Sequence, residues 1–222
     1  MNPTRAAWFF VAGLAWLVLR SILVNAVPQL RADHVAEQGG LLLFIPLVSA
    51  VASLAAPLFF LSFLRHHPFQ RQRVLQITTV LAAIASLLSF ALVLMAFVTT
   101  VGGTRIIDSS SQLFVSWLLQ TIPLLFVGSL FLFLVAFAQS DVCNPVLRRA
   151  AAVGAVGTMI PLMMMAAWVI HSRFPELLTW YPAVSQSLVA KVLGLAAAGT
   201  LLWFLETFAT TYDTGVDVAD QD

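Results

Sequence analysis

Six long apolar segments alternate with short polar segments along the 222-residue chain. A helix that crosses the ~30 Å hydrocarbon core of a bilayer needs about 20 mostly apolar residues, because each residue rises only 1.5 Å. The pattern predicts spans over residues 6–27, 41–64, 74–99, 113–138, 150–170 and 188–208. The third and fourth spans are the clearest, since no charged residue occurs between Val74 and Thr104 or between Ser109 and Ser140.

Continuous apolar segments of this length indicate helices, because the strands of a transmembrane barrel alternate in short segments. A helix also satisfies its backbone hydrogen bonds internally, as lipid requires. We therefore predict an all-α integral membrane protein, a single bundle of six transmembrane helices with short loops. Residues 1–209 would form this domain. Residues 210–222 carry four aspartates and no apolar pattern, so we expect an acidic, disordered cytoplasmic tail.

The arginines of the loops predict the orientation, because short loops rich in Lys and Arg stay in the cytoplasm. The densest cluster is the turn 65–73, between the second and third spans. One side of the six-span arrangement carries Arg5, Arg65, Arg71, Arg73, Arg148 and Arg149, and the other carries Arg31, Arg105 and Arg173. We predict that both termini are cytoplasmic. The residues that anchor this topology would be Arg65, Arg71, Arg73, Arg148 and Arg149.

The first segment has a second interpretation. Arg5 followed by the apolar residues 6–19 resembles the charged and apolar regions of a signal peptide, and residues 24–26 would supply a cleavage site. Arg20, inside the segment, argues against this interpretation. Cleavage would leave five spans and would not change the orientation of the others.

Composition supports a membrane location and narrows the partners. Charged residues make up 9% of the chain, whereas soluble domains carry roughly 25%. With so little charge the chain cannot cover a globule in water, and membrane lipids are the expected partners. A net charge of +1 and the absence of a basic aromatic surface argue against nucleic acid. The lone Cys143 excludes an internal disulfide and a Cys-x-x-Cys site.

Three polar residues inside the predicted spans are candidates for ligand binding. Arg20 lies ~5 Å beyond the middle of the first span, toward the outer side, and ionisable residues at such depth usually face the bundle or a wet cavity. Gln120 and Lys191 fall in the outer halves of the fourth and sixth spans. Two cations without a carboxylate at matching depth suit an anionic ligand or a lipid phosphate. We predict that Arg20, Gln120 and Lys191 form an outward-facing polar pocket.

Each cation also has a structural alternative. Arg20 would extend to the interface or pair with Asp108 or Glu176. Lys191 lies close enough to the end of its span to reach the headgroups in the same way. The small residues around it, Gly194 and Ala198, resemble a helix-packing stripe, as do Ala151, Gly154 and Thr158 in the fifth span.

Prolines and a short repeat leave two interpretations open. Pro46, Pro57, Pro123 and Pro161 each remove a backbone donor and allow a kink. Kinked helices build transport sites, but proline is also simply common in membrane helices. Ile-Pro-Leu occurs in spans two, four and five. In a three-plus-three duplication spans two and five would be equivalent, which fits the first and last copies of this tripeptide. Chance also explains such a short match in a chain of this composition.

Signatures of catalysis and of cofactor binding are missing from the sequence. It contains no His-Glu-x-x-His, no Gly-x-Ser-x-Gly, no phosphate loop and no paired intramembrane carboxylates. This pattern leans against an enzyme. No histidine falls within the middle of a span, so we predict no cofactor, with His34 and His171 left as one geometrically possible outer haem pair. Three consecutive methionines, 163–165, point in different directions on a helix and predict core filling, not metal binding.

Two classes of function fit these observations. The first is a small permease or membrane binding component for an anionic or amphipathic ligand, with Arg20, Gln120 and Lys191 as its contacts. The second is a non-catalytic subunit or scaffold of a larger membrane complex, or a homo-oligomer, with the small-residue stripes as contact faces.

Overall fold

The structure, a computed structural model, describes residues 2–26, 44–65, 72–102, 112–140 and 144–213, and these residues form helices joined by short turns, without strands. The helices are α1 (Pro3–Ala26), α3 (Phe44–Ser53), α4 (Ala55–Leu64), α5 (Arg73–Gly102), α6 (Gln112–Ala138), α7 (Pro145–Arg173), α8 (Tyr181–Gln186) and α9 (Leu188–Asp213). They provide six segments long and apolar enough to cross a membrane, with α3 and α4 together forming the second. The predicted all-α fold with six spans is confirmed.

The spans that begin with Asn-Pro start earlier than the apolar pattern indicates. The Asn2 side chain accepts a hydrogen bond from the Thr4 amide at 3.1 Å, and Asn144 accepts one from the Val146 amide at 3.1 Å. Each asparagine thus caps a helix whose first residue is proline, which needs no donor of its own there. At the other end of the chain α9 continues to Asp213, so the predicted tail begins within a helix. Residues 214–222 lie outside the described ranges.

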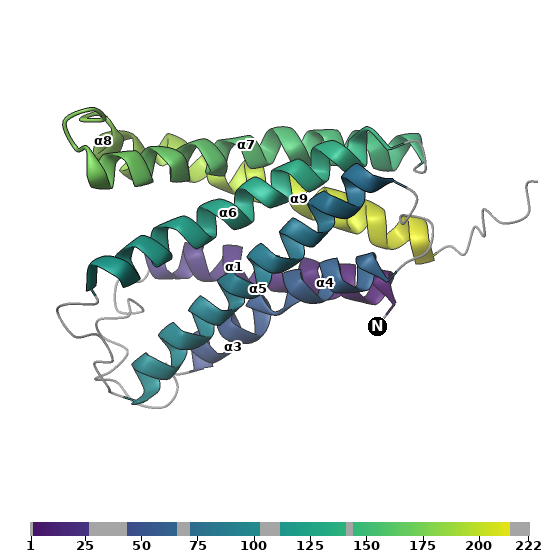
Figure 1. Cartoon of the computed structure of the whole chain (residues 1–222), viewed down its shortest axis with the longest axis horizontal. Coiled ribbons are helices and arrows are strands. Elements are labelled where there is room, and N and C mark those ends of the chain that lie inside the picture. The colour runs from purple at the N-terminus through teal and green to yellow at the C-terminus, as the bar shows by residue number, and fades with distance from the viewer. Residues whose placement is uncertain (1, 27–43, 66–71, 103–111, 141–143, 214–222) are drawn as a thin grey trace, which may run out of the picture.

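The six spans form a closed ring in chain order. α1 packs against α3 and α4, which pack against α5; α5 packs against α6, α6 against α7, α7 against α9, and α9 against α1. Among the described spans, backbone contacts occur only between neighbours in this ring and never between helices on opposite sides of it. The N-terminus and the end of α9 lie at one end of the bundle, and α8 lies at the opposite end (Figure 1). We call these ends the termini side and the far side.

The second span is divided where the sequence predicts a continuous helix. Leu54 separates α3 from α4, because the ring of Pro57 provides no amide hydrogen and crowds the carbonyl of Ser53, four residues earlier. Pro123 and Pro161 lie inside α6 and α7, and both helices continue through them. Proline alone therefore does not set where a span is broken.

Candidate functional site

Burial differs sharply between the two sides of the ring. On the termini side the helices share a continuous core. On the far side no described residue is buried in residues 14–23, 44–48, 87–98, 117–121, 159–173 and 188–196. The described side chains of the far half therefore pack less closely than those of the termini side. The far half of the ring is therefore the candidate region for a ligand site.

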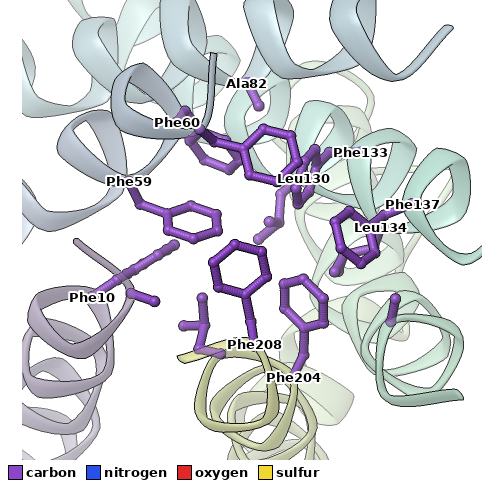
Figure 2. Packing of buried hydrophobic residues seen from close by; sticks show 14 of the residues in the cluster. Phe10, Phe59, Phe60, Ala82, Leu130, Phe133, Leu134, Phe137, Phe204 and Phe208 are labelled. Carbon is purple, nitrogen blue, oxygen red and sulfur yellow. The ribbon is translucent and has the colours of Figure 1, made fainter. Parts of the chain in front are cut away.

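Aromatic rings fill the termini-side half. Phe133 on α6 is fully buried, and its ring centroid lies 5.2 Å from that of Phe60 and 5.3 Å from that of Phe63, both edge-to-face. On the opposite part of the ring, Phe208 of α9 lies 5.4 Å from Phe59. We call this set the phenylalanine cluster, and its members from α1, α4, α6 and α9 converge on the middle of the ring (Figure 2). They are Phe10, Phe59, Phe60, Phe63, Phe133, Phe137, Phe204 and Phe208. Because side chains alone bridge the ring, this cluster closes the termini side.

The sequence carries a signal for this cluster that the apolar pattern alone does not reveal. Phenylalanine recurs four residues apart at positions 59 and 63, 133 and 137, and 204 and 208, always in the last third of a span that ends on the termini side. Residues four apart share a helix face. Three such pairs at one depth predict a shared aromatic layer.

Arg20 lies on the face of α1 that points toward the bundle. Ala6, Phe10 and Gly13 are buried on this face, and at 100° per residue Arg20 continues the same stripe. It is nevertheless exposed, since the far half of the ring contains no packed core. Its guanidinium is therefore an accessible cation on a bundle-facing stripe.

Lys191 lies on α9, the helix that closes the ring against α1. Thr200 and Phe204 of α9 face α7, because they contact Gly157 and Gly154. Lys191 lies on the opposite flank at helical spacing, the flank next to α1. It is exposed, like Arg20. The two predicted cations thus occupy neighbouring helices of the far half.

Gln120 has a different neighbour. Its side-chain oxygen accepts a hydrogen bond from the Ser172 hydroxyl at 3.0 Å, which joins α6 to the last turn of α7. The backbone of α6 packs against α5 and α7; among the described helices it does not approach the backbone of α1 or α9, and α6 meets α9 through side chains of the phenylalanine cluster. The structure therefore brings Gln120 to Ser172 and leaves the two cations on the other part of the ring. A serine in the last turn of a helix is a weak signal in sequence, and this pairing was not predicted.

The small residues fall into two groups. A methyl group added at Gly154 would reach van der Waals contact with Leu134 and Phe204, and one added at Gly157 would collide with Thr200, so the predicted packing stripe of the fifth span is a close contact between α7, α6 and α9. Gly194 and Gly199 differ: a methyl group added at either would meet no atom within 4 Å. The two glycines point in directions about 140° apart on α9, so they are two separate open positions and not one face.

His171, in the last turn of α7, and Tyr181, the first residue of α8, pack against each other. Their ring centroids lie 5.4 Å apart, and the Nδ1 atom of His171 is buried without a hydrogen-bond partner among the described residues. Burial raises the pKa of Tyr181 above its ordinary value. His34, the other histidine of the possible haem pair, lies outside the described ranges. Within those ranges no group of three or more histidine, cysteine or acidic residues could hold a metal ion.

The arginines that would anchor the topology lie at the termini side. Arg65, Arg73, Arg148 and Arg149 are exposed at helix ends, and Arg71 falls outside the described ranges. Arg148 also has a structural role, since its Nε donates to the carbonyl of Ala138 at 3.1 Å and so caps the last turn of α6. These positions fit the predicted turn but do not show which side of a membrane it faces.

Comparison with known proteins gives no family. No protein-family model, no curated protein and no solved structure matches the chain. The helices and their composition are those of a multi-pass membrane protein with six candidate spans.

Proposed function

We propose that the protein is a small permease or membrane binding component that takes an anionic amphipathic ligand into the far half of its ring. The observation that carries this proposal is the uneven burial: a closed aromatic layer on one side and, among the residues that the structure describes, no buried residue in the span ends on the other. A membrane protein that admits a ligand from one side needs this combination of a closed half and an open half. In the orientation predicted from the arginines, the open half faces outward.

The chemistry of the ligand follows from what lines the open half. Arg20 and Lys191 provide positive charge on adjacent helices, and among the described acidic residues only Glu176, in the exposed connection between α7 and α8, lies on the far side. Arginine binds carboxylate and phosphate groups through paired hydrogen bonds. Exposed apolar side chains one helical turn away, Leu17 for Arg20 and Leu195 for Lys191, lie beside these cations and suit an alkyl chain. A single-chain carboxylate or phosphate would use both features.

Neutralising Arg20 tests this proposal. In neutral detergent, the purified protein should bind a dansyl-labelled fatty acid more tightly than the matching dansyl-labelled fatty alcohol. Arg20→Gln should weaken binding of the acid about 10- to 100-fold, because hydrogen bonds to charged groups contribute about 1.5–3 kcal/mol. Binding of the alcohol should not change. Fluorescence titration measures both affinities.

The matched control is Arg173→Gln, which removes one positive charge from the same side of the bundle at the exposed end of α7. It should leave the affinity for the acid within about twofold, as expected for a screened surface charge. Equal losses in Arg20→Gln and Arg173→Gln, or no loss in either, would contradict a site at Arg20. Thermal unfolding of each variant shows whether the fold is kept.

A second candidate function, a subunit of a larger membrane complex, is favoured by the far part of α9. Gly194 has open space around it in the far part of α9, and close helix approach in membranes uses such small residues. Under this alternative, purification in mild detergent should recover a partner chain in fixed stoichiometry, and Gly194→Leu should release it. A monodisperse single chain whose behaviour is unchanged by Gly194→Leu would contradict the subunit role.

A further inference from the structure

The break in the second span leaves α3 weakly joined to α4. Pro57 has no amide hydrogen to donate to the carbonyl of Ser53. The Leu54 amide bonds to the Val51 carbonyl at 3.1 Å, three residues back, and the four-residue pattern resumes only with Leu58. The Ser53 hydroxyl donates to the Ala50 carbonyl at 2.7 Å and so satisfies an acceptor at the broken turn. Few backbone bonds therefore hold α3 in line with α4.

The two halves of this span are also anchored unequally. α4 contributes Phe59, Phe60 and Phe63 to the phenylalanine cluster. The buried residues of α3 are small, namely Ser49, Ala50 and Ala52. Dispersion contacts scale with the number of packed atoms, so the small side chains hold α3 much less firmly than the aromatic rings hold α4.

One polar link joins the middle of α3 to α1. The indole Nε1 of Trp16 donates to the Ser49 hydroxyl at 3.2 Å, and that hydroxyl donates to the Ile45 carbonyl at 2.7 Å. One turn closer to the break, Gly13 permits a backbone approach: a Cβ placed there would lie 2.7 Å from the Ala52 carbonyl oxygen. Arg20 lies one turn beyond Trp16 on α1, so this link lies next to the proposed ligand contact.

We propose that α3 is a hinged segment that pivots at Leu54 on a fixed α4, and that the Trp16–Ser49 hydrogen bond is the latch that holds it against α1. Opening the latch moves the far end of α3 and changes access to the open half beside Arg20. The claim that this movement controls ligand access rests on the proposed function. The hinge itself rests only on the break, the unequal anchoring and the Trp16–Ser49 bond.

Distances between spin labels test the hinge in the purified protein without any ligand. In a Cys143→Ser background, one label on α6 at Leu132→Cys is paired with Leu47→Cys on α3 or with Leu61→Cys on α4; all three native side chains are exposed. We expect a broad or two-component distribution for the α3 pair and a single narrow one for the α4 pair. Double electron–electron resonance measures both.

Removing the latch should act on α3 alone. Trp16→Phe keeps a ring but removes the donor, and it should raise the population of the minor component of the α3 pair roughly threefold, the effect of an average hydrogen bond between membrane helices. Ser49→Ala should do the same. Trp8→Phe, the same substitution at an exposed position of α1, should change neither pair.

Equally narrow distributions for α3 and α4, or a distribution of the α3 pair that does not respond to Trp16→Phe, would overturn the hinge. Because no ligand is present, these outcomes are independent of the Arg20 titration. A mobile α3 together with unchanged fatty-acid binding in Arg20→Gln would support the hinge and contradict the proposed ligand site.

Discussion

Phe133→Ala should be among the most destabilising single substitutions in this chain. Phe133 is fully buried in the middle of the ring and contacts aromatic rings from α4, α6 and α9. Replacing a buried phenylalanine with alanine costs about 3–5 kcal/mol in soluble cores. In lipid the transfer term is smaller, because acyl chains are as apolar as the core. We therefore expect about 3 kcal/mol, which lowers Tm by about 6–12 °C in a chain of this size.

The control for this substitution is its neighbour on the same helix. Leu132 is 48% exposed and faces away from the ring, so Leu132→Ala should change Tm by less than about 2 °C. The Tm of both variants is measured by heating the protein in detergent and monitoring the loss of the monodisperse peak in size-exclusion chromatography. If Phe133→Ala were as stable as Leu132→Ala, the rings would not be what joins the helices on the termini side.

The number of spans could be predicted because lipid imposes it on sequence. Each span must be about 20 apolar residues long and must satisfy its own backbone, so it is visible as a continuous apolar segment. The ring order is less visible, since almost every face of these helices is apolar and no period separates the lipid face from the core face. α5 illustrates this: Ile84 and Ala83 are adjacent and apolar, yet one is 52% exposed and the other is buried.

For the candidate site residues, the sequence predicts only how deep each one lies along its span. Arg20 and Lys191 were expected in the outer halves of their spans, and they lie in the far half of the ring on neighbouring helices. Which residues meet across helices depends on rotation about each axis, and a lone Gln120 gives no sign of it. Its bond to Ser172 follows from how α6 packs on α7. The Trp16–Ser49 bond depends likewise on the close approach that Gly13 permits.

Gly157→Ala should show how tightly the ring is closed between α7 and α9. A methyl group at this position would collide with the side chain of Thr200, and its distance to the Thr200 Cβ would be only 3.0 Å. Rotating the Thr200 side chain cannot relieve that second contact, so the two helices must separate. Overpacking of this kind costs about 1–3 kcal/mol. We expect Tm to fall by about 2–10 °C in thermal unfolding, although alanine favours helix over glycine by about 1 kcal/mol.

Two further variants separate the collision from a general effect of the substitution. Gly199→Ala adds the same methyl group to α9 one residue before Thr200, where no atom lies within 4 Å, so it should leave Tm unchanged or raise it. Combining Gly157→Ala with Thr200→Ala removes the threonine oxygen and methyl group and should recover part of the lost stability, because the close contact with the Cβ of residue 200 remains. The resulting coupling energy is expected to be about 1–2 kcal/mol, as for residues in direct contact. Additive losses in the double variant would mean that α7 and α9 do not meet at Gly157, and the ring would then be open on that side as well.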